Sequence, residues 1–477
     1  MAKLRYYPQQ NICDVIAILY SSEMSKKIFL NYLFVLFFIL TFSSAAAADY
    51  EIYTLACPFK TLKDEITKDE LVKAAAADPL RTGEIKDIYL SAADAELFSN
   101  VFGNDLGRLN IVPDPSKMIL ENVPFVSCAI IPVDKIDPTM KIVRIDTEFY
   151  PWDDDYDPEK DILAVKSEHN NFNTDKVTTL LLTGTTALAR TTSYKMYLNG
   201  PLYPAELIKP VFDNSDITHI SNESSIWSLC PDPINTNGTM QFCTQQNAFE
   251  LFDYLDVDVI ELSGNHLRDY DWKPLLEMLD EFDLRGYKYY AAGRDYVSAA
   301  QPLFAEHNGN KFVFLGCNAA GPEHVYVDDT RPGVNRCDMD EMENKIKSFA
   351  EKGYIVIATI QYFETYSRVP SSMQERDFKR LSDAGAVVVS GSQAHYSQTM
   401  LPLRDRFIHY GLGNLFFDQM DYPVKGTSQE FLDRYVFYEG KLLNVQLISA
   451  VLTDFARPRL MTEYERINFL SEIFNHM

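Results

Sequence analysis

The stretch from Asp256 to Asp271, which reads DVDVIELSGNHLRDYD, constrains the fold of this chain more than any other. Its first half is a short apolar run rich in β-branched residues, long enough for a buried strand and too short for a helix. The run stops at Gly264-Asn265-His266, and a helical pattern begins near Trp272. Because glycine permits a sharp turn, Asn265 and His266 are expected at the carboxyl edge of a sheet, where open α/β sheets bind ligands. Simple turn chemistry is the alternative explanation for three such residues.

The same pattern recurs from Val177 onwards. Seven apolar runs that end in small or polar residues are predicted as strands: Thr178–Leu182, Ile217–Ile220, Val257–Leu262, Phe312–Leu315, Tyr354–Ile360, Ala386–Val389 and Phe407–Tyr410. Helical patterns lie between several of them, for example Pro274–Leu284, Met339–Lys352 and Ser371–Ala384. This alternation predicts a layered α/β domain. We expect the polar clusters to converge on one pocket rim, because packing alone rarely requires His and Glu at strand ends.

The region before Val177 has a different pattern. Residues 49–165 mix helical stretches with short strands such as Lys141–Ile145, which predicts a smaller α+β domain. Residues 166–176 are interpreted as a linker after an acidic run, and residues 177–477 as the main domain with its carboxyl-terminal strands and tail.

Residues 1–48 have the composition of a secretory signal region. Two lysines after Met24 precede an apolar run from Ile28 to Thr41, and an alanine-rich segment follows before Asp49. This order predicts a signal peptide whose true start is Met24. The mature protein is therefore expected to be exported, to the periplasm or the outside of a bacterial cell envelope. The alternative is an uncleaved leader, which would be its membrane attachment, although the apolar run is short for a spanning helix.

Cysteine usage is consistent with export. Removing Cys13 with the leader leaves six cysteines, and an even number in an exported chain indicates disulfides. The pairs expected are Cys230–Cys243, Cys317–Cys337 and Cys57–Cys128. Zinc binding is disfavoured because the chain has no CxxC pair.

The net charge of −24 argues against a nucleic-acid partner, whose phosphates the chain would repel. The sequence leaves the oligomeric state open.

The order of the polar clusters resembles the CapA family of capsule-synthesis proteins, also called the poly-γ-glutamate synthesis family. That family is similar in fold to the calcineurin-like metallophosphoesterases. The segments that carry the resemblance lie between Val177 and Phe417: Leu182–Arg190, Ser221-Asn222-Glu223, Gly264-Asn265-His266, Ala292-Gly293-Arg294, Gly391–His395 and Tyr410–Asn414. The resemblance implies a metallophosphoesterase-like β-sandwich flanked by helices. It also implies a part in capsule or poly-γ-glutamate biosynthesis, with a pocket that acts on or holds an anionic polymer.

Three positions depart from the family pattern in a way that bears on metal binding. Thr185 stands where an aspartate is usual, Gln361 where a histidine is common, and the segment Gly391–His395 keeps only the last histidine of the usual Gly-His-His-Pro-His. Neutral side chains bind transition metals poorly, and a two-metal site needs several anionic or imidazole donors. No cofactor is therefore expected. The weak candidates for a divalent metal are Asn222, Asn265, His266 and His395.

The remaining polar residues can still perform chemistry. We expect Glu223, His266 and His395 to be the catalytic groups, because a histidine paired with a carboxylate can act as general acid or base near neutral pH. The ligand-binding residues expected from the family match are Arg190, Asn222, Asn265 and Asn414. The alternatives are that Glu223 caps a helix and that Arg190 pairs with a structural acid.

The geometry expected of this site is specific. Glu223, Asn265, His266 and His395 should lie within hydrogen-bond or single-water reach of one another, each following a strand of one sheet.

Three functions fit these features. The first is an exported capsule-assembly protein that cleaves, transfers or holds an anionic polymer. The second is an inactive, polymer-binding or ligand-binding relative of a hydrolase, and the third is a metal-dependent phosphoesterase with unusual ligands. The sequence leaves open whether the chain is a hydrolase, a transferase or a non-catalytic binder.

Overall fold

The structure is a computed structural model, which describes residues 49–75, 85–103, 109–121, 126–236 and 238–477. The predicted signal region, residues 1–48, lies outside the described residues. Within the described part of the chain, every helix is too short or too polar to cross a bilayer.

The amino-terminal part forms a mixed sheet with the strand order β2-β6-β1-β5-β3-β4. Its strands are β1 (Asp49–Pro58), β2 (Glu65–Ile66), β3 (Ile85–Ser91), β4 (Asn110–Val112), β5 (Val126–Pro132) and β6 (Met140–Ile145), followed by β7 (Ala164–Ser167). Its helices are α3 (Lys68–Ala75), α4 (Ala92–Ala95), α5 (Ser99–Phe102) and α6 (Pro115–Glu121). Successive residues of β1 face opposite sides of the sheet, so Leu55 and Ala56 belong to different apolar clusters. Both faces of the sheet are therefore covered.

The first of two larger sheets has the strand order β11-β10-β9-β8-β21-β22-β23, with β20 also paired to β8. Its strands are β8 (Val177–Thr186), β9 (Ile217–Asn222), β10 (Val259–Glu261), β11 (Lys288–Tyr290), β20 (Asn414–Phe416), β21 (Gln429–Tyr438), β22 (Lys441–Thr453) and β23 (Arg457–Leu460). Strands β8 to β11 are parallel, whereas β21 runs antiparallel to β8. All residues of β8 are buried, as expected for a central strand covered on both faces.

The second larger sheet has the strand order β13-β14-β16-β17-β19-β18. Its strands are β13 (Leu303–His307), β14 (Asn310–Asn318), β16 (Ile355–Gln361), β17 (Val388–Ser392), β18 (Met400–Pro402) and β19 (Phe407–His409). Strands β14, β16, β17 and β19 are parallel neighbours. A short pair, β12 (Ala292–Gly293) with β15 (Gly333–Val334), lies outside both sheets.

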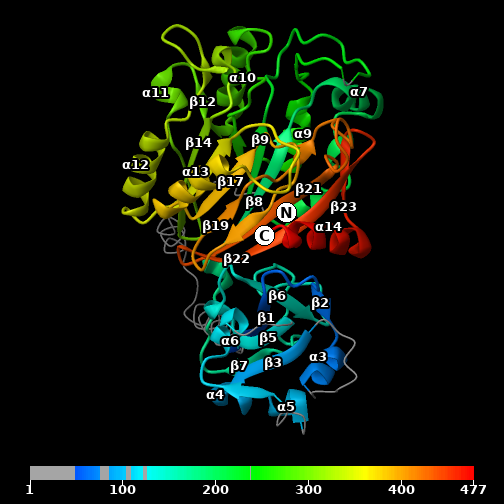
Figure 1. The fold of residues 1–477 in the computed structure, drawn as a ribbon, viewed down its shortest axis with the longest axis vertical. Helices are drawn as coiled ribbons and strands as arrows, with labels where there is room; N and C mark the ends of the chain where they lie inside the picture. The colour runs from blue at the N-terminus through cyan, green and yellow to red at the C-terminus, as the bar shows by residue number, and fades with distance from the viewer. Residues whose placement is uncertain (1–48, 76–84, 104–108, 122–125, 237) are drawn as a thin grey trace, which may run out of the picture. The chain divides into compact units, whose positions relative to one another are not determined.

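The two larger sheets pack face to face with helices on their outer faces (Figure 1). The alternation of side chains along β8 and β14 shows this directly. Leu180 of β8 and Phe314 of β14 share the apolar cluster between the sheets, whereas Leu181 joins the cluster with helices α9 and α10. Leu315 faces α12 and α13 on the other side. The predicted layered α/β sandwich is confirmed.

The helices complete the layers. They are α7 (Arg190–Asn199), α8 (Lys209–Asp213), α9 (Ala248–Leu255), α10 (Trp272–Arg285), α11 (Tyr296–Ala299), α12 (Met339–Ala350), α13 (Ser372–Asp383) and α14 (Glu463–Asn475). Three of them, α10, α12 and α13, match predicted helices to within two residues at each end.

One expectation about the strands is wrong. The residues of the predicted site were expected to follow strands of one sheet, but β9 and β10 belong to the first larger sheet and β17 to the second. In the structure the edge of β8 opposite β9 pairs with the antiparallel strand β21, and the parallel strands β14, β16, β17 and β19 form a second sheet. The chain returns to the first sheet through β20, which follows β19 and pairs with β8. The carboxyl ends of both sets of parallel strands meet at this edge.

Candidate functional site

The site is built where the strands of the two sheets end. Glu223 directly follows β9, Asn265 and His266 follow β10, and His395 follows β17. Gly264 permits this arrangement, because a Cβ atom at that position would lie 2.5 Å from the Cα atom and the carbonyl oxygen of Glu223. Only glycine therefore allows the turn after β10 to lie against the end of β9.

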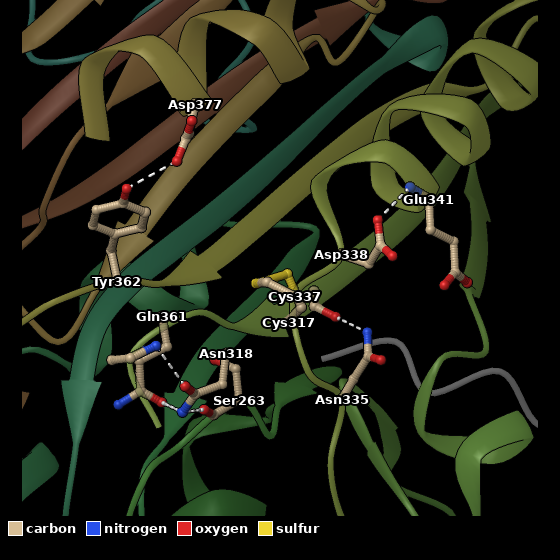
Figure 2. Close-up of a disulfide and its surroundings, with 12 residues drawn as sticks. Ser263, Cys317, Asn318, Asn335, Cys337, Asp338, Glu341, Gln361, Tyr362 and Asp377 are labelled. Carbon is tan, nitrogen blue, oxygen red and sulfur yellow. Dashed lines mark hydrogen bonds between the residues drawn. A yellow bond between two sulfur atoms is a disulfide. The ribbon is translucent and has the colours of Figure 1, made fainter. Parts of the chain in front are cut away.

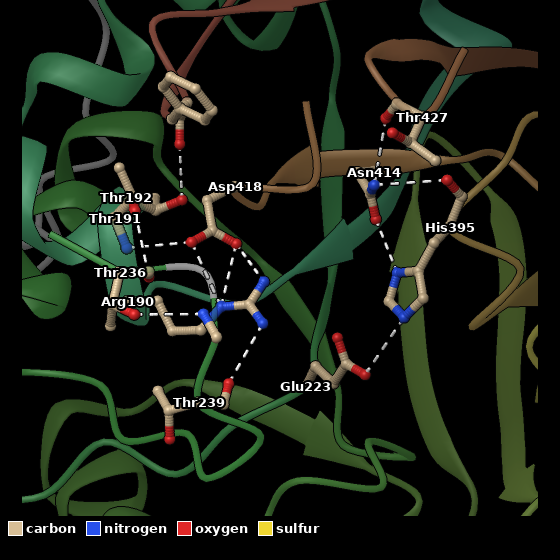
Figure 3. Close-up of polar contacts among 12 residues, drawn as sticks. Arg190, Thr191, Thr192, Glu223, Thr236, Thr239, His395, Asn414, Asp418 and Thr427 are labelled. Carbon is tan, nitrogen blue, oxygen red and sulfur yellow. Dashed lines mark hydrogen bonds and ion pairs between the residues drawn. The ribbon is translucent and has the colours of Figure 1, made fainter. Parts of the chain in front are cut away.

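His395 and Glu223 face each other across this edge (Figure 3). The Nε2 atom of His395 lies 3.9 Å from Oε1 of Glu223, and its Nδ1 atom lies 2.8 Å from Oδ1 of Asn414. The amide nitrogen of Asn414 donates to the carbonyl oxygens of His395 and Thr427, at 3.4 and 3.2 Å. Because that nitrogen faces two acceptors, Oδ1 must accept from Nδ1 of His395. A neutral His395 therefore presents the lone pair of Nε2 to Glu223.

The carboxylate of Glu223 has no hydrogen-bond partner among the described residues. Its side chain is 1% exposed, and neither carboxylate oxygen receives a hydrogen bond. Buried carboxylates are normally paired or hydrogen-bonded, because burying an uncompensated charge is costly. The helix-cap role considered as the alternative is not what the contacts show, since Glu223 follows β9 and caps none of the described helices. Both carboxylate oxygens are thus left without a donor among the described residues.

His266 is held by a residue that sequence reasoning missed. Its Nδ1 atom lies 2.6 Å from Oδ2 of Asp269, and the same oxygen accepts the N–H of Phe242 at 2.7 Å. The Phe242 ring stacks on the imidazole with a centroid distance of 3.8 Å. Burial lowers the pKa of His266, but the hydrogen bond to Asp269 and the charge of Glu223 outweigh it, so the pKa lies above its ordinary value. The His-x-x-Asp spacing in the turn was the available sequence signal.

Arg190 is engaged within the protein. Its guanidinium forms a buried ion pair with both carboxylate oxygens of Asp418 and donates to the carbonyl oxygen of Thr239 (Figure 3). It also lies between the rings of Phe242 and Phe417, 4.8 Å from each centroid. These contacts match the alternative reading, in which Arg190 pairs with a structural acid.

The neutral residues that replace expected metal ligands bind one another. The amide nitrogen of Gln361 donates to Oδ1 of Asn265 at 2.9 Å and contacts Oε1 of Gln393 closely. Asn318, at the end of β14, donates to Oε1 of Gln361 and to the carbonyl oxygen of Ser263 (Figure 2). Asn265 thus lies at the same edge as Glu223, but its side chain is tied to Gln361.

Asn222 contributes a further buried acceptor. Its amide nitrogen donates to the carbonyl oxygen of Ser224 at 2.9 Å, while Oδ1 has no partner in the described part of the chain. The hydroxyl groups of Thr185 and Thr186 at the end of β8 are also buried and unpartnered among the described residues.

These donors do not fit a binuclear metal centre. Among the described residues, no group of three or more His, Cys, Asp or Glu side chains is placed to hold a metal ion. Gln361 and Gln393, at the positions where the resemblance implies ligands, use their amides on each other and on Asn265.

The three cysteine pairs expected from the sequence are bonded in the structure. They are Cys57–Cys128, Cys230–Cys243 and Cys317–Cys337. Two of them adjoin the site: Cys317 directly precedes Asn318 (Figure 2), and Cys243 directly follows Phe242.

Two packed sheets with helices on their outer faces, and polar clusters at the strand ends, define a layered α/β sandwich with a candidate site at one edge. The chain belongs to the family described as bacterial capsule synthesis protein PGA_cap, whose model matches residues 179–419, about half of the chain.

Two curated relatives have sequences similar to this chain. The capsule biosynthesis protein CapA of Bacillus anthracis is 24% identical over 227 residues, which are 46% of this chain and 55% of that protein. The PGA biosynthesis protein CapA of Bacillus subtilis (strain 168) is 21% identical over 215 residues, 45% of this chain and 56% of that protein. The chain therefore spans about half of the length of the curated relatives it matches.

Solved structures with some likeness include two nucleotidases. A 5'-nucleotidase precursor from Thermus thermophilus is 15% identical with a TM-score of 0.37, and the match covers 63% of this chain and 58% of that one. The NAD nucleotidase NadN of Haemophilus influenzae is 11% identical with a TM-score of 0.36, and the match covers 63% and 56%. Scores this low carry no conclusion about activity.

Proposed function

We propose that this chain is an exported capsule-assembly protein that binds an anionic polymer such as poly-γ-glutamate at the edge formed by Glu223, His266 and His395. The family membership supports the capsule role. The single observation that carries the site is the buried Glu223 carboxylate, which has no hydrogen-bond partner among the described residues and faces Nε2 of His395. A group that costs stability and serves no contact within the protein is typical of a binding site.

Export is part of this proposal. Three disulfides support an oxidising compartment, because cytosolic thiols are normally kept reduced. The apolar segment between Ile28 and Thr41 supports a secretory route.

The chemistry available at the site is proton transfer. His266 is anchored by Asp269 through Nδ1, and the hydrogen bond to Asp269 and the charge of Glu223 raise its pKa above the ordinary value. His395 is anchored by Asn414. The two anchored histidines therefore place two groups capable of proton transfer beside Glu223.

Binding of a defined polymer tests the proposal. The full chain is mixed with poly-γ-glutamate in isothermal titration calorimetry, with and without Mn²⁺, and polymer length is followed over time. We expect binding that does not depend on Mn²⁺ and is lost in His266→Ala. The control Glu281→Gln changes a half-buried residue of α10 that pairs with Arg285, and it should bind as the wild type does. Mn²⁺-dependent hydrolysis of a phosphoester without polymer binding would contradict the proposal and favour the phosphoesterase reading.

A further inference from the structure

We propose that the Glu223 carboxylate and the Nε2 atom of His395 together bind a primary ammonium group, supplied by the free amino terminus of the polymer. This inference rests on the proposed function and names the part of the polymer that the site recognises.

The charges around Glu223 leave its carboxylate uncompensated. Arg190 is paired with Asp418, and His266 is paired with Asp269. The charge of Glu223 also raises the pKa of His266, but Asp269 shares that imidazole, so these two cations face three carboxylates. The closest contact of the Glu223 carboxylate is then Nε2 of His395 at 3.9 Å. That distance is longer than a hydrogen bond. The group that enters should bring positive charge.

The hydrogen-bonding atoms point to the same conclusion. Because Asn414 fixes the proton of His395 on Nδ1, a neutral His395 presents a lone pair to a carboxylate that also only accepts. Two acceptors that face each other need a donor between them. A nitrogen about 2.9 Å from each atom fits across a 3.9 Å separation. An ammonium group carries three N–H donors, so it serves both acceptors and brings the charge.

The alternatives to ammonium are less well matched. A bridging water would satisfy both acceptors but leave the charge of Glu223 uncompensated. A transition metal would need more donors than Glu223 and His395 supply, because zinc sites use at least three protein ligands. The described residues offer no group of three His, Cys, Asp or Glu side chains for it. A ligand carboxylate would meet Glu223 with like charge, and Arg190 is already occupied.

The test compares two forms of one ligand on the unchanged protein. A γ-linked glutamate pentamer with a free amino terminus and its N-acetylated counterpart are titrated into the full chain at pH 7 by calorimetry. We expect the free form to bind at least tenfold more tightly. In Glu223→Gln this preference should disappear, whereas in Glu281→Gln it should persist. Because the acetylated ligand needs no protein variant, the comparison stands even if Glu223→Gln fails to fold.

Propylammonium and MnCl₂, each titrated alone, separate the possible failures. Equal binding of both pentamers would overturn the ammonium site and leave the polymer function standing. Binding of propylammonium that requires Glu223, with neither pentamer bound, would support the ammonium site and contradict the polymer function. Mn²⁺ binding that requires Glu223, without propylammonium binding, would show that the site takes a metal and overturn the inference.

Discussion

The Nε2 atom of His395 and the Oε1 atom of Glu223 face each other at 3.9 Å, and in the neutral form of His395 both are hydrogen-bond acceptors. The two residues are far apart in the sequence and come from different sheets. Their meeting is a consequence of the sandwich, in which the carboxyl ends of two parallel sets of strands share one edge. In the proposed function, a ligand completes this unsatisfied pair.

Replacing Glu223 by glutamine should stabilise the protein while removing ligand binding. The amide can donate to Nε2 of His395 and carries no charge, so a buried unpaired carboxylate is relieved. We expect the free energy of unfolding to rise by about 1–3 kcal/mol, measured by urea denaturation at pH 7. A lower denaturation midpoint than that of the wild type would show that Glu223 stabilises the fold.

Replacing Asp269 by asparagine should lower the pKa of His266. The carboxylate accepts from Nδ1 at 2.6 Å and favours the protonated imidazole, and a neutral amide would favour it less. Nuclear magnetic resonance titration of the His266 ring measures the change. Asp283→Asn, on the same turn-and-helix segment but away from His266, is the control and should leave that pKa unchanged. If the pKa of His266 is unaltered in Asp269→Asn, Asp269 does not control the protonation of His266.

The raised pKa of His266 also predicts how stability depends on pH. A histidine whose pKa is higher in the folded state than its ordinary value of about 6.5 binds protons more tightly when folded. Its contribution to stability is fully present below the unfolded pKa and is lost as the pH rises through the folded pKa. The midpoint of urea denaturation should therefore fall as the pH rises from 5 to 9, and the fall should be smaller in Asp269→Asn than in the wild type. Equal profiles for both proteins would argue against this linkage.

Breaking the Arg190–Asp418 pair should destabilise the fold strongly. Both side chains are buried, so Asp418→Asn leaves an uncompensated guanidinium between two aromatic rings. We expect a loss of about 3–5 kcal/mol in the free energy of unfolding. The exposed pair Lys160–Asp157 is the comparison, and Lys160→Ala should not move the midpoint. Wild-type stability in Asp418→Asn, together with lost polymer binding, would instead make Arg190 a ligand-binding residue.

Removing the Cys230–Cys243 disulfide should loosen the site as well as the fold. The bond closes a loop with a sequence separation of 13, for which chain entropy predicts a loss of roughly 3 kcal/mol. Phe242 adjoins Cys243 and donates its N–H to Asp269, so its amide should exchange with solvent faster in the double serine variant. Hydrogen exchange measures the rate at the Phe242 amide. Unchanged protection of that amide would show that the disulfide does not stabilise the site.

The sequence predicts individual elements of this fold better than their arrangement. The apolar run that becomes β10 and the glycine that ends it can be recognised within a few residues of sequence. The structure adds the reason for the glycine, since a Cβ atom at Gly264 would clash with the backbone of Glu223. The division into two sheets is not local. It depends on the pairing of β8 with β21, a strand that comes after all strands of the second sheet in the sequence. The expectation of one sheet failed for this reason.

The site shows the same limit. His266 and His395 carry a chemical signature in the sequence, and the structure brings both to the edge where Glu223 lies. The residues that pair with these candidate site residues are harder to predict from the sequence. Asp269 was close enough in sequence to be found, whereas Asp418 lies 228 residues from Arg190 and no local pattern connects them. Whether an arginine is free for a ligand depends on such distant contacts.

The central claim is that Glu223 and His395 serve capsule assembly, and the amount of polymer on the cell surface tests it most directly. Cells of the source organism would carry the wild-type chain, Glu223→Gln, His395→Gln or the control Glu281→Gln, each confirmed as folded by its melting temperature. We predict that both site variants lose surface polymer while the control keeps it. Wild-type amounts of polymer in cells that carry folded Glu223→Gln and His395→Gln would contradict the claim.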